Sequence, residues 1–510
     1  MSFRELIKNN KPHLEWLIGI MLYRFLSENL EKRINKLEEQ KDPESFKPYS
    51  EWGEGELENM KEEICTDSGY FISPNNLFKN TFARASKERF TGEKYYILRK
   101  SLNETFKPER VSEWGYDFTE ILKTIDFEKH KAGFTDQQKI NKMVELFEKV
   151  AELDFESEEI KKGFEDIIKA QVREIDKEAN GGEVNPFVHS KEIIDFLFKL
   201  SLNERNPSDI HTIYDPDCNW GYFLLKFREW LGEPQLKIFG HENNESMHAL
   251  CLINLLVHGL TREEFEIKQI PNWHTNLNVL ESSSSKGEKK EYDVIFGNFL
   301  PLSDSRKKHN VSKFINHCSQ HLNPTNGVAV VLYFENAMTI HNLETKNILE
   351  DLAHYRCIDC VISFQDEAKL CAEKVTKSLC ILILKSRNNN TNRNLLMINF
   401  PKNYPSKLEE VTSLFSSEKL QELYRAVIHR DPMVLQNYKH IFLETEQLKE
   451  KDYSLSIRQY IWLANSESKN NQWSESMSAL RKELKVVKKQ IKDLKPIIDN
   501  KLLDLFGETS

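Results

Sequence analysis

The stretch HTIYDPDCNWGYFLLKFREWLGEP, residues 211–234, combines a short apolar strand, a turn that carries an acid and a glycine, and an amphipathic helix. Phe223 and Phe227 lie one helical turn apart and therefore fall on one face of that helix. Gly232 and Pro234 follow in the order expected at a helix C-terminus. A strand, a turn and a helix in this succession are typical of an α/β fold.

Further short apolar runs follow, and helical segments separate them, as in a parallel, doubly wound sheet. With the run in the opening stretch, the expected strands are HTIYD (211–215), LKIFG (236–240), YDVIFG (292–297), GVAVVLYF (327–334), CIDCVISF (357–364) and SLCILILK (378–385). We therefore predict an α/β domain that binds any ligand at the carboxyl ends of its strands.

The regions on either side of these strands have a helical pattern. Residues 1–178 are rich in Lys and Glu, and the stretch KEANGGEVNP (177–186) interrupts that pattern with paired glycines and a proline. Near the C-terminus, a heptad seam is indicated by Met477, Leu480, Leu484, Val487, Ile491, Leu494 and Ile498. We expect an all-α N-terminal domain (1–178), an α/β domain (179–470) and a helical tail (471–510) that packs on a partner or on a neighbouring domain.

The composition is that of a soluble globular protein of 510 residues, with 30% charged and 39% hydrophobic residues. A net charge of -9 argues against coating of nucleic acid by bulk attraction and leaves room for a local basic patch. The apolar run LEWLIGIMLYRFL (14–26) is interrupted by Glu15 and Arg24. We therefore expect a core helix, no membrane contact and a cytoplasmic protein.

Eight cysteines without regular spacing suit a reducing compartment. Cys357 and Cys360 in RCIDCVISF are interspersed with Ile and Val, as in a buried strand. No second Cys or His pair completes a zinc set, so we predict core packing for this pair and no metal site.

Candidate binding residues end the first two expected strands. Asp215 and Gly221 flank a turn whose amides and following helix face a ligand in many α/β proteins, although a tight packing turn explains one glycine equally well. Glu242 lies 21 residues beyond Gly221, where a carboxylate accepts from ribose hydroxyls in nucleoside-binding folds. The alternative role for Glu242 is an acid beside the N-terminus of the next helix.

A third apolar strand ends at Asn298, and this order of strands and polar residues is that of amino-group methyltransferases that use S-adenosylmethionine. More closely, the chain resembles the modification (M) subunit of type I restriction–modification systems, an adenine-N6 DNA methyltransferase. The stretches that carry the resemblance are LIGIMLYRFLSENL, SGYFISPNNLF, GGE, IYDPDCNWGYFLL, FGHENNESMHALCLINLLVHGL, YDVIFGNFLPLS and DYSLSIRQYI. It implies a Rossmann-like class I methyltransferase domain with S-adenosylmethionine as its cofactor.

The resemblance also assigns roles to the cofactor residues. Asp215 and Gly221 would face the methionine end of the cofactor, and Glu242 its ribose. Phe187 would take the place of an aromatic residue that closes over the methyl donor. The family motif DPxxGxG is changed here, because Asn219 replaces its first glycine and Trp220 stands between the two glycine positions. Asn tolerates a positive φ, whereas we expect Trp220 to crowd the methionine end.

The family's catalytic motif is an Asn, two prolines and an aromatic residue. Here Asn298 is followed by Phe299, Leu300 and Pro301. By resemblance, the Asn298 side chain and the carbonyl of Phe299 would accept from the N6 amine of a flipped adenine, and Pro301 stands where the aromatic residue would stack on the base. We therefore expect impaired catalysis, and the alternative is an inactive methyltransferase-fold scaffold or a DNA-binding assembly subunit.

The partners implied by the resemblance are DNA, a specificity (S) subunit, a second M subunit and a restriction (R) subunit. The heptad tail is the expected contact with the S subunit. A nicotinamide-dependent oxidoreductase is a poor alternative, because no GxGxxG motif follows the first strand.

Overall fold

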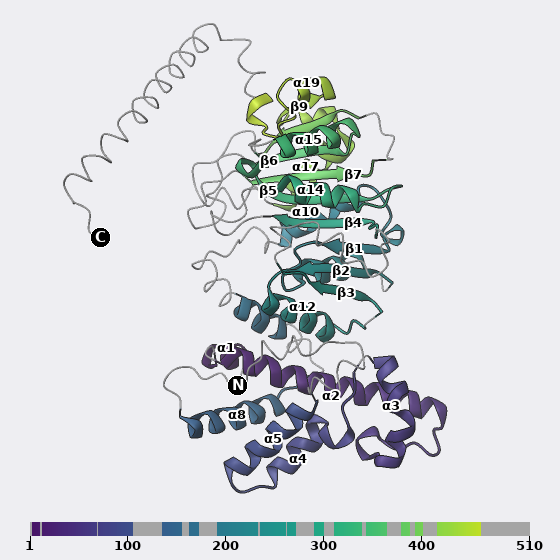
Figure 1. Ribbon diagram of the computed structural model, residues 1–510, viewed down its shortest axis with the longest axis vertical. Helices are drawn as coiled ribbons and strands as arrows, with labels where there is room; N and C mark the ends of the chain where they lie inside the picture. Colours follow the sequence, from purple (N-terminus) through teal and green to yellow (C-terminus); the bar gives the residue numbers. More distant parts are fainter. Residues whose placement is uncertain are drawn as a thin grey trace, which may run out of the picture. The chain divides into compact units, whose positions relative to one another are not determined.

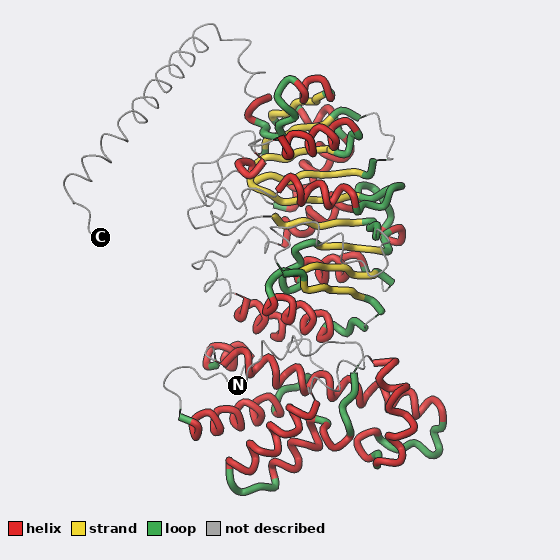
Figure 2. Tube along the Cα trace, viewed as in Figure 1, coloured by secondary structure: helices red, strands yellow, loops and turns green. Residues whose placement is uncertain are grey.

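The protein is described by a computed structural model (Figures 1 and 2). The described residues are 3–10, 13–68, 70–105, 135–155, 163–172, 191–232, 235–261, 263–271, 290–299, 311–338, 343–364, 379–387, 393–400 and 416–460. By internal contacts the chain divides into two units, Met1–Leu455 and Ser456–Ser510. Phe187, Pro301 and the predicted tail lie outside the described residues, and the division into three domains remains a prediction.

The described N-terminal part of the chain, before residue 173, contains helices and no strand. Its helices are α1 (Phe3–Asn9), α2 (Leu14–Lys41), α3 (Glu54–Ser68), α4 (Phe78–Ser86), α5 (Thr91–Thr105) and α8 (Asp136–Ala151), with short 3-10 turns at Tyr49–Glu51 (η2) and Pro74–Asn76 (η3). Residues 163–172 are also helical. The expected core helix is confirmed: in α2, Leu17 and Tyr23 are fully buried. The Tyr23 hydroxyl donates to the Asn76 carbonyl at 2.5 Å. Across the described helices, none has both the length and the apolar character that a bilayer crossing requires.

The rest of the first unit is built on one large sheet (Figure 2). Its strands are β1 (Thr212–Asp215), β2 (Lys237–Glu242), β3 (Phe265–Gln269), β4 (Val294–Phe299), β5 (Val328–Phe334), β6 (Ile358–Phe364), β7 (Leu379–Lys385), β8 (Leu395–Asn399) and β9 (Lys439–Leu443). They lie in the order β3-β2-β1-β4-β5-β7-β6-β8-β9. The six predicted strands are all present, and β3, β8 and β9 were not predicted.

Most neighbouring strands are parallel, as expected, whereas β7 is antiparallel to β5 and β6, and β9 is antiparallel to β8. An apolar run indicates a buried strand and carries no information on its direction, so these reversals had no signal in the sequence. Cys357 directly precedes β6, and Cys360 lies within it. Both are fully buried free thiols, which confirms core packing for that pair.

Helices cover both faces of the sheet. The helices are α10 (Lys191–Leu202), α11 (Tyr222–Leu231), α12 (Glu245–Val257), α14 (Val311–Gln320), α15 (Leu343–His354), α17 (Ser417–Tyr424), α18 (Pro432–Leu435) and α19 (Thr445–Lys449), with short segments η5 (Pro207–Asp209), η6 (Glu335–Met338) and η8 (Arg425–His429). Phe198 of α10 and Phe227 of α11 pack on Phe296 of β4, with ring centroids 5.5 and 5.4 Å away. Phe314 of α14 packs on Phe299 at 4.9 Å. Side chains alternate along a strand, so α10 and α11 lie on one face and α14 on the other.

Asp293 directly precedes β4 and joins it to the start of β1. Its Oδ2 accepts hydrogen bonds from the amides of His211 and Thr212 at 2.9 and 3.0 Å, and from the Thr212 hydroxyl at 3.1 Å. Its Oδ1 accepts from Asn323 Nδ2 at 2.8 Å. Because Asp293 is only 6% exposed, water is a poor substitute for these bonds, and they hold the two strands in register.

Asp293→Asn tests this constraint. The amide removes the charge and replaces one acceptor oxygen by a donor, so buried N–H groups lose their partner. We expect the free energy of unfolding, measured by urea denaturation, to fall by about 2 to 4 kcal/mol. The matched control is Asp351→Asn on the exposed surface of α15, which should change it by less than about 0.5 kcal/mol. Equal stability of the two variants would contradict the assignment.

Candidate functional site

The turn after β1 adopts a left-handed backbone conformation at two positions, where the sequence has an Asn and a Gly. Asn219 and Gly221 both have a positive φ, of 50° and 74°. Asn219 Nδ2 donates to the Asp217 carbonyl at 2.7 Å, and the Gly221 amide donates to the Cys218 carbonyl at 2.8 Å. The replacement of glycine by Asn219 is therefore tolerated, because its side chain hydrogen-bonds locally in the left-handed conformation.

Gly221 is required for a second reason besides its φ. A Cβ atom at this position would lie 2.7 Å from Sγ of Cys251, which belongs to α12. The residue is also the N-cap of α11. Gly221 thus allows α11 and α12 to approach closely, so the packing role proposed for this glycine is present whether or not the turn also faces a ligand.

Asp215, the last residue of β1, is a buried carboxyl group. It is 4% exposed and its Oδ1 accepts from the Asp217 amide at 3.0 Å. Burial raises the pKa of the Asp215 carboxyl to about 8, although the Asp217 amide acts in the opposite direction. At neutral pH the group is therefore largely uncharged unless a cation approaches it.

Glu242, the last residue of β2, is 3% exposed, and its Oε1 accepts from the Asn244 amide at 2.6 Å. The following helix, α12, begins only at Glu245, and Asn244 is its N-cap, accepting from the Met247 amide at 3.0 Å. Glu242 therefore contacts the N-cap residue of α12, as an acid beside a helix N-terminus would, and both roles considered for it remain predictions.

Asn298 and Phe299 end β4 and point to opposite faces of the sheet. The Asn298 Oδ1 is buried and has no hydrogen-bond partner among the described residues. Phe299 is 1% exposed, and its ring packs on Phe314. Asn298 therefore offers an acceptor at the strand end, whereas Phe299 offers only its backbone carbonyl, because its ring belongs to the core.

Strand alternation places the predicted polar residues together. In the parallel register Asp215 lies beside Gly240, so Glu242, two residues further along β2, shares its face. Tyr214 lies beside Ile295, which puts Asn298 on that face as well. All three are at the carboxyl ends of adjacent strands, where β1 and β4 meet. The chain continues from β1 to β2 on one side and from β4 to β5 on the other, so this is the topological switch point of the sheet (Figure 1).

A hydroxyl–imidazole network lies on the opposite face and was missed from the sequence. The Tyr214 hydroxyl is 2.7 Å from Nδ1 of His241 and 2.9 Å from Nε2 of His317, and its ring stacks on Tyr292. Burial, assisted by the nearby Lys268 ammonium, lowers the pKa of His241 to about 3. Single His residues in apolar segments are too common for the sequence to signal such a network.

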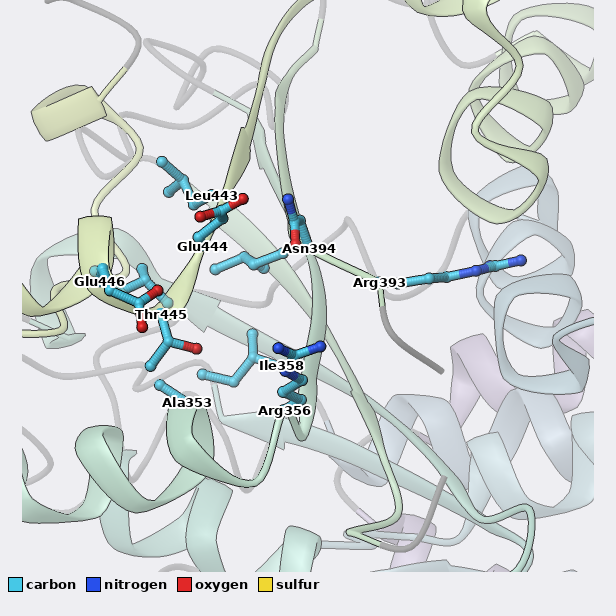
Figure 3. Close-up of a pocket in the computed structure, with 11 residues that line it drawn as sticks. Ala353, Arg356, Ile358, Arg393, Asn394, Leu443, Glu444, Thr445 and Glu446 are labelled. Atoms are coloured by element: carbon cyan, nitrogen blue, oxygen red, sulfur yellow. The ribbon is translucent and has the colours of Figure 1, made fainter. Parts of the chain in front are cut away.

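One pocket of about 300 Å³ lies elsewhere, at the amino ends of β6 and β8 (Figure 3). Its lining includes Ile358, Leu395, Arg356 and Glu444, and Arg393 extends away from Glu444 in the close-up. It contains none of the predicted site residues and lies at the opposite edge of the sheet from them. Within the described ranges, no group of three or more His, Cys, Asp or Glu side chains is arranged to hold a metal ion.

The order β3-β2-β1-β4-β5-β7-β6, with β7 antiparallel, defines a class I methyltransferase fold, as predicted. Among solved structures, a type I restriction-modification methyltransferase subunit from Streptococcus thermophilus superposes with a TM-score of 0.66 at 17% identity, over 90% of this chain and 100% of that one. A structure from work on assembly and conformational transition of the type I R-M system gives 0.53 at 14% identity, over 98% and 99%.

Sequence comparison identifies the family. Residues 164–469 match the N-6 DNA Methylase family, and this chain belongs to it. The methylase subunit of the type I restriction enzyme MpnII from Mycoplasma pneumoniae is 24% identical over 95% of this chain and 92% of its own length. The methylase subunit of EcoEI from Escherichia coli is 26% identical over 32% of this chain and 35% of its own length.

The lowered pKa of His241 predicts an acid-sensitive fold. An unfolded His binds a proton near pH 6.5, whereas folded His241 does so only near pH 3. Its contribution to stability is therefore present above pH 6.5 and is lost as the pH falls toward 3. His241→Gln should reduce the loss of unfolding free energy between pH 6.5 and 5 by up to about 2 kcal/mol. Urea denaturation at several pH values measures this slope, and His354→Gln on the exposed end of α15 should leave it unchanged.

Proposed function

We propose that this chain is the M subunit of a type I restriction–modification enzyme and transfers a methyl group from S-adenosylmethionine to N6 of adenine in DNA. The observation that carries this proposal is the match to a methylase subunit of such an enzyme over nearly the full length of both chains. That match includes the helical N-terminal region as well as the methylase domain, so it supports the role of the whole subunit.

The cofactor residues proposed from the sequence are Asp215, Gly221, Glu242 and Phe187. Two buried carboxyl groups at adjacent strand ends, beside a turn with a left-handed glycine, suit a ligand with a ribose and an ammonium group. Glu242 would accept from the ribose hydroxyls. The ammonium of the methionine portion would favour the ionised form of Asp215, whose pKa burial raises to about 8. Phe187 would close over the donor.

The target base would be held by Asn298. When bound, the cofactor supplies an electrophilic methyl group on its sulfonium. Asn298 Oδ1, a buried acceptor without a described partner, would accept one N6–H of adenine, and the carbonyl of Phe299 the other. Both hydrogen bonds increase electron density on N6 and orient its lone pair, and both strengthen as positive charge develops on that nitrogen in the transition state. Pro301 stands in place of a stacking aromatic residue.

We also propose that methyl transfer is slow. The base loses a stacking contact of about 1 to 3 kcal/mol when Pro301 replaces an aromatic residue. The second candidate function is a scaffold that keeps the fold and its partner surfaces without chemistry. The observation that favours it is the position of Phe299. This residue stands where the family has its first proline, and its ring packs in the core against Phe314.

The proposed partners follow from the proposed activity. They are DNA, an S subunit that selects the sequence, a second M subunit and an R subunit. This activity would place the protein in the cytoplasm. The tail from 471 to 510, proposed as a domain separate from 1–178 and 179–470, would contact the S subunit through its heptad seam.

Glu242→Ala tests the cofactor site. Loss of a charge-assisted hydrogen bond contributing roughly 1.5 to 3 kcal/mol should weaken S-adenosylmethionine binding by at least about tenfold in isothermal titration. Glu418→Ala, at an exposed position of α17, is the control and should bind as the unaltered chain does. Unchanged affinity of the Glu242 variant would remove this residue from the site.

Asn298→Ala separates catalysis from binding. The complex with an S subunit is incubated with target DNA and labelled cofactor, and N6-methyladenine is counted. We expect the rate to fall by at least about 100-fold, because the acceptor acts on the transition state, while cofactor affinity stays within about twofold. Exposed Asn437→Ala should retain the rate. If the unaltered complex gives no methyladenine at all while it still binds the cofactor, the scaffold function is the correct one.

A further inference from the structure

Trp220, the residue expected to crowd the cofactor turn, is a buried packing residue. It is 5% exposed, and its ring stacks on Tyr222 with centroids 4.8 Å apart and planes inclined by 26°. Its carbonyl accepts from Nδ2 of the buried Asn254 on α12 at 3.0 Å. The Trp220 ring thus contacts α11 by stacking on Tyr222, and the Trp220 backbone contacts α12 through its carbonyl.

The Tyr222 ring is in turn held by two ammonium groups. Lys169 Nζ lies 5.0 Å from the ring centroid and Lys226 Nζ lies 5.7 Å from it, both within range of a cation–π interaction. Glu165 connects the two cations, at 2.6 Å from Lys169 and 3.4 Å from Lys226. Burial would raise the pKa of Glu165, but these lysines hold it below its usual range, so the carboxylate stays charged between them.

Lys169 and Lys226 belong to different parts of the chain. Lys226 belongs to α11 itself, whereas Lys169 lies in the helical residues 163–172, far from the turn in sequence. The same helical segment contacts α2, because Gln171 Nε2 donates to Glu15 Oε1 at 3.3 Å. Residues 163–172 therefore connect the N-terminal helices to the first turn of α11, next to Gly221.

We propose that Lys169, Tyr222 and Trp220 form a clamp that positions the turn 215–221 for the cofactor. The clamp adds to the local hydrogen bond that Asn219 makes within the turn, where this residue holds a left-handed conformation. The clamp is made of the bulky residue between the two glycine positions of the family's turn motif and of a cation from outside the methyltransferase strands. Trp220 and Lys169 are positioning residues in this proposal, which rests on the proposed function for the identity of the ligand.

The clamp has a consequence for the N-terminal helices. A ligand or partner that moves residues 163–172 changes the cation–π contact on Tyr222, and hence the turn that faces the cofactor. By linkage, the cofactor affects the affinity of that partner by the same factor. The helical region is then an effector of cofactor affinity as well as a packing partner.

The first measurement needs no cofactor. Hydrogen exchange followed by mass spectrometry reports the opening of the turn in peptides that cover residues 215–222. Lys169→Met keeps the length of the side chain and removes its charge, so these amides should exchange at least about threefold faster while the melting temperature stays within about two degrees. Lys94→Met removes a Lys–Glu148 ion pair elsewhere among the N-terminal helices and should leave the turn unchanged.

The second measurement is titration with S-adenosylhomocysteine. The clamp predicts that Lys169→Met binds at least about threefold more weakly, that Trp220→Phe retains affinity because it keeps a ring on Tyr222, and that Trp220→Gly loses it. If Trp220 instead obstructs the cofactor, Trp220→Gly should bind S-adenosylhomocysteine more tightly than the unaltered chain does.

Unchanged exchange in Lys169→Met, or tighter binding by a folded Trp220→Gly variant, overturns the clamp. If the unaltered chain binds no S-adenosylhomocysteine, the proposed ligand is wrong, and the exchange data still decide whether Lys169 holds the turn.

Discussion

The arrangement of the site depends on the carboxylate of Asp293. It lies at the amino end of β4 and accepts from the backbone at the start of β1, so it fixes how far these two strands are displaced along each other. β1 and β4 are the strands that meet at the switch point. Their paired region is short: Ile213 pairs with Val294, and Tyr214 pairs with Ile295. A shift by one residue would move Asn298 to the opposite face from Asp215. The polar residues at the ends of the strands therefore share a face only because the beginnings of the strands are held in register.

Close packing at three glycines then sets how closely the helices and the turn approach each other and the sheet next to the site. At Gly221 a Cβ would meet Cys251, at Gly240 it would meet Cys218, and at Gly297 it would come 2.6 Å from Phe314. Gly221 thus lets two helices approach, whereas Gly240 and Gly297 let a turn and a helix pack directly on the sheet. The density of a protein interior makes these contacts sensitive to a single methyl group, so the site is defined by the side chains that are missing as well as by those that are present.

Much of this arrangement was predictable because buried strands and helix ends have strong local signals. Apolar runs identified β1, β2 and β4 to β7, whereas β3 (FEIKQ) and β9 (KHIFL) mix charged residues into their half-exposed surfaces and resemble loops. The left-handed turn at Asn219 followed from the known tolerance of Asn for positive φ. The burial of Phe299, the imidazoles around Tyr214 and the lysines on Tyr222 depend on residues distant in sequence, and no local pattern encodes such contacts.

The loss of the family's prolines is partly offset by the strand itself. A proline after Asn298 would lack an N–H and would end the hydrogen-bonded ladder there. With Phe299 in that place, β4 continues, and Asn298 and Phe299 pair with Leu332 and Tyr333 of β5. The Phe299 ring adds buried apolar contact with Phe314 on the far face. The Asn298 backbone and the following carbonyl are therefore held by the sheet instead of by proline rings. Strand pairing keeps this end of β4 rigid, and in the proposed function only the aromatic surface for the base has no replacement.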